Sequence, residues 1–260
     1  MKIQEVIDAL ERFAPLPLQE SFDNAGLQVG LTEAEVSGAL LCLDVTEQIV
    51  DEALRRDCNL IVSHHPLLFH GLKRISGDDY VQRTVMKAIQ GGVTIVSMHT
   101  NMDNALGGVN FKMAEKLAMH DVTFLTEESR AAGHGSAVIG SLPEPMASAA
   151  FIAQVKTAFG TGAVLCNELL QRPVTRVAIC GGAGAFLLGE ALRQGADAFI
   201  TGEMHYHEYF GHEQQIQIAV IGHYESEQYT SEIFRSVIEE ACPGVRTCIA
   251  ATVTNPIIYR

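Results

Sequence analysis

An internal repeat constrains the fold of this chain more than any other feature. Residues 39–65 align without a gap on residues 177–203, so that residue 39 falls on residue 177, a shift of 138 positions. Cys42 then falls on Cys180, and the run "EALR" is shared. Both copies continue through a helical pattern to a strand-like run that ends in histidine, at "TIVSMHT" and "IAVIGHYE". A repeat of this length predicts two related lobes.

Strand-like apolar runs alternate with helical periods along the chain, which predicts an α/β fold with mostly parallel sheets. The predicted helices cover residues 3–14, 46–56, 79–90 and 108–119, and the predicted strands cover residues 37–44, 59–63 and 92–100. The polar segment 127–136 is the best linker, so we expect an N-terminal lobe over 1–126 and a C-terminal lobe over 127–260. Residues 142–146, "LPEPM", are expected to form a turn. A last strand is expected near 246–253, and the sequence leaves both lobes open as its partner.

Composition places the chain among globular proteins. It has 260 residues, of which 47% are hydrophobic and 19% are charged, enough for a substantial core. No apolar run is long enough to span a bilayer, and the N-terminus does not resemble a signal peptide. The six cysteines form no CxxC pair, so a disulfide framework is not expected and a cytoplasmic location is.

Net charge argues against nucleic acid as a partner. The formal charge is −13 at pH 7, and no stretch supplies the basic surface that a nucleic-acid-binding protein needs. The densest positive spot is Lys73 and Arg74, with Arg83 and Lys87 further along. An acidic surface is compatible with a soluble enzyme or an assembly.

Two adjacent histidines, His64 and His65, follow the apolar run at 59–63. Neighbouring side chains of an extended strand point to opposite faces, so both rings can address one site only where the strand ends. Pro66 favours such an end, because it lacks a donor N–H and disfavours helix at the preceding residue. Ligands of open parallel sheets bind beyond the carboxyl ends of the strands. His99, Glu203 and His223 occupy corresponding strand ends.

The strand-end segments "SHHP" (63–66), "HTNMD" (99–103), "TGEMHYH" (201–207) and "GHYESE" (222–227) supply metal-ligand side chains. Imidazole and carboxylate without thiolate suit Zn, Fe, Mn, Co or Ni. His223 and Glu227 are four positions apart and can address one point if a helix begins there. Glu225 is the second choice for this carboxylate. Asp103 is a further ligand candidate, although Asp at such a place is often a helix cap or turn residue.

The remaining histidines and the other familiar catalytic motifs give no competing site. His70, His120, His134 and His212 are expected to be ordinary structural histidines, and His205 and His207 surface or pocket-rim residues. The chain has no GxxxxGK[ST] loop and no GxSxG elbow. "GGAG" (181–184) lacks the rest of a dinucleotide-binding fingerprint.

Six segments together carry a family resemblance: "DNAGLQVG" (23–30), "SHHPLLF" (63–69), "HTNMDNA" (99–105), "TGE" (201–203), "GHYESE" (222–227) and "NPIIYR" (255–260). In this order they resemble the NIF-three-like family, whose YbgI-type members are also labelled GTP cyclohydrolase 1 type 2 homologues. The length is similar to that of the short form of the family. The family often has Asp where this chain has Glu203.

The resemblance implies a dinuclear metal centre whose ligands are His64, His65, Asp103, His223 and Glu227, in a toroidal homohexamer with the sites facing an inner cavity. We expect two divalent metal ions in the cleft between the lobes, bridged by Glu227 and a water or hydroxide and roughly 3.5–4 Å apart, as in other two-metal hydrolytic sites. Each histidine of the pair is expected to bind a different ion.

His99 and Glu203 are the expected catalytic residues. His99 either transfers protons as a general acid or base, or orients a ligand carboxylate through a hydrogen bond. The expected function is metal-dependent hydrolysis of a small molecule, and the resemblance implies a GTP cyclohydrolase-like reaction. Lys73 and Arg74 are the only nearby cations that could meet phosphates. The alternative function is a metal carrier or an oligomeric interaction scaffold without turnover.

Overall fold

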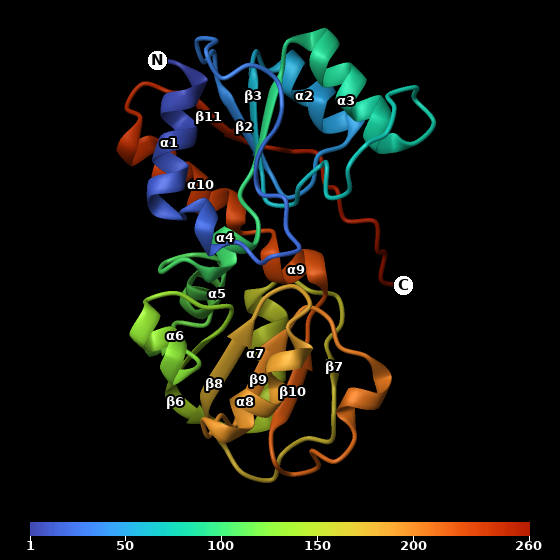
Figure 1. Cartoon of the computed structure of the whole chain (residues 1–260). Helices are drawn as coiled ribbons and strands as arrows, with labels where there is room; N and C mark the ends of the chain where they lie inside the picture. The colour runs from blue at the N-terminus through green and yellow to red at the C-terminus, as the bar shows by residue number, and fades with distance from the viewer. The chain divides into compact units, whose positions relative to one another are not determined.

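The computed structural model describes all 260 residues, which form two compact units, each with its own sheet. The first unit comprises residues 1–102 and 230–256, and the second comprises residues 103–229 and 257–260. Figure 1 shows the chain coloured from its N-terminus to its C-terminus. None of its helices has both the length and the apolar composition needed to cross a membrane.

The first unit contains a five-stranded sheet in the order β1-β4-β3-β2-β11. Its strands are β1 (Gly26–Val29), β2 (Ala39–Cys42), β3 (Leu60–Ser63), β4 (Thr94–Ser97) and β11 (Thr247–Ile249). Its helices are α1 (Ile3–Phe13), α2 (Glu47–Arg55), α3 (Tyr80–Gly91) and α10 (Thr230–Ala241). All neighbouring strands are parallel except β1, which pairs with β4 in the antiparallel direction.

Helices cover both faces of this sheet, α2 and α3 on one side and α1 and α10 on the other (Figure 1). The three central strands β2, β3 and β4 are therefore buried along their whole length, which explains their continuous apolar sequences. Ile49 of α2 and Val85 of α3 pack into one cluster with Leu40, Ile61 and Ile95 of the sheet. Thr46 and Asp79 cap the two helices by accepting hydrogen bonds from backbone N–H groups.

The second unit contains a six-stranded sheet in the order β5-β6-β8-β9-β10-β7. Its strands are β5 (His120–Phe124), β6 (Val138–Met146), β7 (Leu165–Cys166), β8 (Val174–Cys180), β9 (Ala198–Thr201) and β10 (Gln217–Val220). Its helices are α5 (Val109–Lys116), α6 (Glu127–Ala132), α7 (Ser148–Ala158), α8 (Leu188–Arg193) and α9 (His223–Glu227), and α4 (Thr100–Asn104) precedes them. Short 3-10 turns lie at Leu16–Leu18, Ala185–Leu187 and Tyr206–Tyr209.

The second sheet buries both faces, because alternate residues of its central strands join two different clusters. Ile179 and Ile200 pack with Phe151 of α7, whereas Ala178 and Phe199 pack with α8. Only β8, β9 and β10 run parallel, and the other pairs are antiparallel. The α/β class is confirmed. The expectation of mostly parallel sheets fits the first sheet, whereas the second sheet is mixed.

The structure confirms the sequence repeat at the level of elements and register. Helices α2 and α8 end at positions 55 and 193, and strands β3 and β9 cover 60–63 and 198–201, each pair related by the same shift. Cys42 of β2 pairs with Ser63 of β3, and Cys180 of β8 pairs with Thr201 of β9. The two units therefore use the same strand–helix–strand frame to position the residues beyond the strand ends.

The segment 127–136, predicted to be a linker, is largely helical. Thr126 accepts a hydrogen bond from the backbone N–H of Ser129 at 3.0 Å and caps α6, and Gly133 ends that helix in the left-handed conformation. The two compact units instead change at Met102 and Asp103, so they do not coincide with the predicted lobes 1–126 and 127–260. The C-terminal strand β11 pairs with β2 of the first sheet.

Residues 142–146 do not form the predicted turn. They continue β6, whose pairing with β8 is irregular between Ser141 and Met146. Pro143 and Pro145 lie within this irregular stretch, where the missing proline N–H groups interrupt no regular ladder.

Candidate metal centre

The backbone beyond β3 turns both paired histidines toward one side. Strand β3 ends at Ser63, and the backbone N–H groups of His64 and His65 both donate to the carbonyl of Leu43, at 3.1 and 3.0 Å. The hydroxyls of Ser63 and Ser97 both donate to the carbonyl of His65. These bonds replace the strand ladder and fix the turn that the sequence predicted.

His99 joins the pair and completes a group of three imidazoles in the first unit. The ring centroids of His64 and His65 are 5.0 Å apart, and His99 lies 5.2 Å from the first ring and 5.5 Å from the second. One nitrogen of each ring lies within 4.8 Å of the others. The first unit therefore contains three side chains that could hold a metal ion.

A hydrogen bond to Nδ1 fixes each ring of this group. The Nδ1 of His64 lies 2.9 Å from the carbonyl of Met98, and the Nδ1 atoms of His65 and His99 lie 2.7 Å from Asp44 and Asp23. A carbonyl and an ionised carboxylate only accept hydrogen bonds, so Nδ1 carries a proton in each ring, and in the neutral imidazole Nε2 then has the lone pair. Partners of this kind orient histidines that bind metals.

Asp23 and Asp44 were not among the predicted site residues. Burial alone would raise the pKa of Asp23, but hydrogen bonds from His99 and Thr100 outweigh it and lower the pKa to about 2. Asp44 also accepts a hydrogen bond from the hydroxyl of Thr254 at 2.7 Å. Asp44 lies just beyond β2, so the rule that singled out the other strand ends could have found it. Asp23 belongs to "DNAGLQVG", one of the segments that carry the family resemblance, for which no role in the site was predicted.

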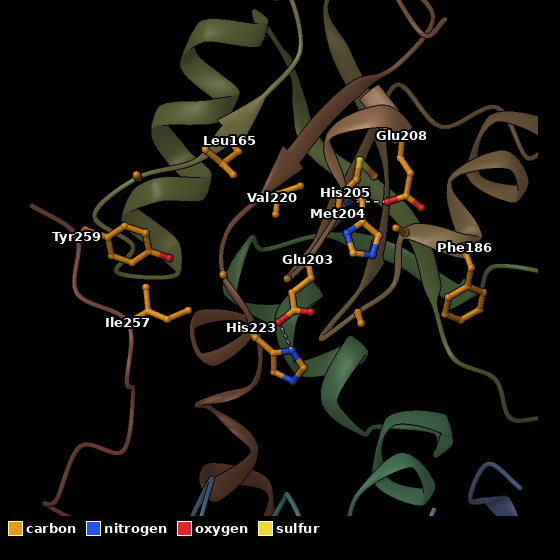
Figure 2. Close-up of a pocket in the computed structure, with 15 residues that line it drawn as sticks. Leu165, Phe186, Glu203, Met204, His205, Glu208, Val220, His223, Ile257 and Tyr259 are labelled. Atoms are coloured by element: carbon orange, nitrogen blue, oxygen red, sulfur yellow. Dashed lines mark hydrogen bonds and ion pairs between the residues drawn. The ribbon is translucent and has the colours of Figure 1, made fainter. Parts of the chain in front are cut away.

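His223 is fixed in the same way in the second unit. It follows β10 and begins α9 after Gly222, whose φ of 102 makes the sharp entry to the helix. Its Nδ1 lies 3.0 Å from Oε1 of Glu203, beyond β9, and its Nε2 lies 3.1 Å from Oε2 of Glu227. Figure 2 shows Glu203 directed at the His223 ring. The predicted i, i+4 pair on one helical turn is therefore present.

Asp103 and Glu227 form a pair of neighbouring carboxylates in the second unit. One oxygen of each lies within 4.8 Å of the other, and Glu227 is buried. Burial, together with the negative charges of Asp103 and Glu227, raises the pKa of the buried Cys180 thiol far above its ordinary value. Glu225 faces elsewhere, because its carboxylate lies beside Gly222. The pKa of Tyr259 is raised mainly by burial and in addition by the negative charge of Glu225.

Gly182 forms the wall against which Glu227 lies. Its φ is +61, and a Cβ there would collide with Oε1 of Glu227 and lie 3.6 Å from Cε1 of His223. Its backbone N–H donates to the hydroxyl of Ser226 at 3.0 Å, which holds the turn against α9. In the alignment of the two repeats, Gly182 corresponds to Asp44. The first unit has a carboxylate at this position, which contacts His65, whereas the second unit has a glycine that leaves room for Glu227.

The structure thus gathers the seven predicted site residues into two groups. The first unit brings together His64, His65 and His99, and the second contains Asp103, Glu203, His223 and Glu227. The individual roles of these residues stay predictions. The hydrogen-bond partner of His99 is Asp23, not one of the predicted ligand carboxylates. Lys73 and Arg74 are exposed, and Arg74 pairs with Asp78 at 3.2 Å.

These donors fit a divalent metal ion. Imidazole nitrogens with fixed tautomers and carboxylate oxygens, without a thiolate, suit Zn, Fe, Mn, Co or Ni. Cys180 does not compete as a ligand, because its elevated pKa keeps the thiol protonated and its Sγ lies 3.0 Å from the carbonyl of Ser136.

Comparison with known proteins identifies the family of the chain. The model of the family Duf34/NIF3 (NGG1p interacting factor 3) matches residues 1–256. A "GTP cyclohydrolase 1 type 2 homolog" of Clostridium acetobutylicum is 30% identical over 100% of this chain and 98% of that protein. The Clostridium perfringens protein of the same name is 32% identical over 87% of each chain.

Solved structures show the same fold. A hypothetical protein of Staphylococcus aureus superposes with a TM-score of 0.91 at 24% identity, over 100% of this chain and 99% of that one. A Bacillus cereus protein related to NIF3 superposes with a TM-score of 0.89 at 22% identity over the same shares. The protein ybgI gives a TM-score of 0.83 at 21% identity, over 99% of this chain and 100% of that one. With a family model that matches nearly the whole sequence, these likenesses show that the chain belongs to the DUF34/NIF3 family.

Proposed function

We propose that the chain is a metal-dependent hydrolase of a small molecule, with two divalent ions held by His64, His65, Asp103, His223 and Glu227. The supporting observation is the shared Nδ1 contact of the imidazoles. In His64 and His65, Nδ1 contacts an acceptor at 2.9 and 2.7 Å, so the neutral ring presents Nε2 as the lone-pair nitrogen. His223 has Glu203 at Nδ1, and its Nε2 lies 3.1 Å from Glu227, another of the proposed ligands. Ordinary surface histidines need no such common orientation, whereas metal ligands do.

Bound divalent ions of this kind lower the pKa of a coordinated water toward neutrality. The protein's own part is to move protons and to position the substrate. Nδ1 of His99 donates a hydrogen bond to the ionised Asp23. The other ring nitrogen, Nε2, can therefore accept and return a proton. Oε1 of Glu203 accepts a hydrogen bond from Nδ1 of His223 at 3.0 Å and so orients the ring. Its carboxylate can also accept hydrogen bonds from a substrate.

The names of the relatives make GTP the first compound to test. They are called GTP cyclohydrolase 1 type 2 homologues, and such a reaction would open the imidazole ring of the guanine by hydrolysis and release formate. The exposed Lys73 and Arg74, which follow the paired histidines in sequence, are the cations that we propose for binding its phosphates.

Metal analysis tests the first half of this proposal. Protein purified without chelator and supplemented with Zn, Fe, Mn, Co or Ni is expected to contain close to two equivalents per chain. Less than one equivalent after supplementation would contradict a dinuclear centre. A variant with both His64→Asn and His223→Asn should bind almost none, and His120→Asn, at an exposed position outside the site, is the matched control.

A substrate screen tests the second half. Metal-loaded protein should be assayed against nucleotides, phosphoesters and cyclic amides, with the chelated protein as the blank. Turnover that disappears on chelation and returns on metal addition is the expected result. Full metal occupancy without turnover of any class would favour the metal carrier or interaction scaffold instead.

A further inference from the structure

A pocket of about 610 Å³ opens in the second unit beside His223. It is formed at the carboxyl ends of β9 and β10, by the turn that follows β8 and by the C-terminal tail (Figure 2). This volume lies within the range of about 300–1,000 Å³ that is usual for small-molecule sites. Its position at the strand ends is also where α/β sheets bind ligands.

The walls of this pocket are apolar and unusually exposed. Leu165, Phe186, Ile257 and Tyr259 line it and are 62%, 72%, 54% and 43% exposed, respectively. Four large apolar side chains around one opening mark a surface that a ligand or partner covers. The two aromatic rings offer faces on which a flat ligand can stack.

The polar groups of the pocket are acidic or neutral. Glu203 and Glu208 line it together with His205, and none of the lining residues is Lys or Arg. Oε1 of Glu203 contacts His223, while the second oxygen of Glu203 points away from that ring (Figure 2). Glu208 accepts a hydrogen bond from the backbone N–H of His205 at 2.6 Å, which keeps its charge at the rim. Arg260 is exposed and does not line the pocket.

The hydroxyl of Tyr259 adds a neutral donor at the opposite wall. Burial and the nearby Glu225 raise the pKa of Tyr259 above its ordinary value, so the hydroxyl keeps its proton at neutral pH. The ligand is therefore met by aromatic faces, carboxylate acceptors and a hydroxyl. In the protein without bound metal, a phosphate would find the carboxylates of Glu203 and Glu208 and no Lys or Arg among the lining residues, which is unfavourable.

We propose that this pocket binds a phosphate-free nitrogen heterocycle, neutral or cationic, whose ring lies against Phe186 or Tyr259 and whose N–H groups donate to Glu203. The assignment rests on the proposed function, because it places the body of the substrate beside His223. It narrows that function, since the side chains of this pocket offer the phosphates of a nucleoside triphosphate two carboxylates and neither Lys nor Arg.

Matched ligand pairs test this proposal by calorimetry. Adenosine, guanosine, cytidine and uridine, with 7-methylguanosine as a cationic probe, are compared with the four nucleoside triphosphates on metal-loaded protein and on chelated protein. At least one nucleoside should bind at least tenfold more tightly than its triphosphate to the chelated protein. Equal or tighter binding of the triphosphates, or no binding of any nucleoside at millimolar concentration, overturns the proposal.

Two variants locate the binding. Phe186→Ala removes an exposed ring and should weaken nucleoside binding about tenfold, as loss of base stacking commonly does, without changing the metal content. Glu203→Lys should reverse the preference toward triphosphates, whereas Glu168→Lys, exposed and outside the pocket, should not.

These outcomes separate the pocket from the metal proposal. Absence of metal with preserved nucleoside preference contradicts the hydrolase and leaves the pocket standing. Full metal content with no such preference overturns the pocket alone. A change of oligomeric mass in Phe186→Ala with unchanged affinity would assign the apolar rim to a second copy of the chain and overturn the ligand.

Discussion

At the scale of single residues, Gly182 is a glycine whose replacement would act directly on a predicted metal ligand. Its positive φ disfavours any side chain, and a Cβ would collide with Oε1 of Glu227. Gly182→Ala should therefore displace Glu227 while leaving the buried sheet intact. The expected result is a loss of at least one metal equivalent per chain, measured by elemental analysis, with an unfolding temperature lowered by only a few degrees.

Gly189 provides the matched control for this prediction. It lies in α8, where an added Cβ would lie 3.7 Å from the flexible Arg193 guanidinium and the backbone conformation is ordinary. Gly189→Ala should leave metal content unchanged and stabilise the helix by up to about 1 kcal/mol. Equal metal content in both alanine variants would show that the collision does not determine how Glu227 is held.

The role of His99 stays a prediction that mutation can test. Its bond to Asp23 at 2.7 Å would orient a general base, as the equivalent bond of His65 to Asp44 would orient a metal ligand. His99→Asn should keep both metals and lower turnover by about 10²- to 10⁴-fold, the usual contribution of a general acid or base. His64→Asn, measured beside it, should lose metal. If His99→Asn lost metal and activity in proportion, His99 would be a ligand or a support for one.

The site could be predicted from sequence to the extent that strand ends could be located. His64, His65, His99, Glu203 and His223 were found because each follows an apolar run, and parallel strands bring their carboxyl ends to one edge. Asp23 could not be found in this way, because it reaches His99 from a loop 76 residues away in sequence. No local pattern encodes such a contact.

At the scale of elements, the segment after β11 is held by one buried carboxylate. Glu52 of α2 accepts hydrogen bonds from the backbone N–H groups of Ala251 and Thr252, at 2.8 and 2.9 Å. Arg56 donates to the same side chain at 2.8 Å. Burial alone would raise the pKa of Glu52, but these bonds outweigh it and lower the pKa from 4.5 to about 2.

This lowered pKa makes the first unit sensitive to acid. The charged form is favoured by folding, so its stabilisation is complete above pH 4.5 and is lost as the pH falls toward 2. The shift corresponds to about 3 kcal/mol, at 1.4 kcal/mol per pKa unit. Glu52→Gln should be less stable than the parent protein by about 1–3 kcal/mol at pH 7 in urea unfolding, because one partner of buried hydrogen bonds is weakened.

The comparison with the parent protein at low pH completes this test. The difference between Glu52→Gln and the parent should shrink from pH 4.5 downward and vanish near pH 2. Glu33→Gln, which removes an exposed ion pair with Lys2, should change stability by less than about 1 kcal/mol. A difference that stayed constant down to pH 2 would rule out the charge of Glu52 as the cause.

The fold was predictable where periodicity is strong and local. The predicted helix over 46–56 and the predicted strand over 59–63 differ from α2 and β3 by at most one residue at each end. One error falls where a polar segment predicted a linker. Residues 127–132 form a short surface helix with no buried residue to give an apolar period. The pairing of β11 with β2 depends on tertiary structure and left no local signal.

At the scale of the whole molecule, the resemblance predicts a homohexamer, and the charge of the chain predicts how such an assembly would respond to salt. Each chain carries a formal charge of −13, so identical subunits repel one another and apolar contacts must supply the attraction. Exposed side chains such as Leu31 and Ile258, 76% and 73% exposed in the single chain, are available for this purpose.

Raising the ionic strength should therefore preserve or strengthen the assembly. Salt screens the repulsion between exposed charges that lie more than about 10 Å apart at 0.1 M, whereas contacts between apolar surfaces are not weakened by it. Light scattering at micromolar concentration should give six times the chain mass of 28.2 kDa, and the fraction of hexamer should be at least as large in 500 mM NaCl as in 50 mM. Dissociation on adding salt would mean that ion pairs hold the subunits together, and a monomer at every concentration would refute the hexamer.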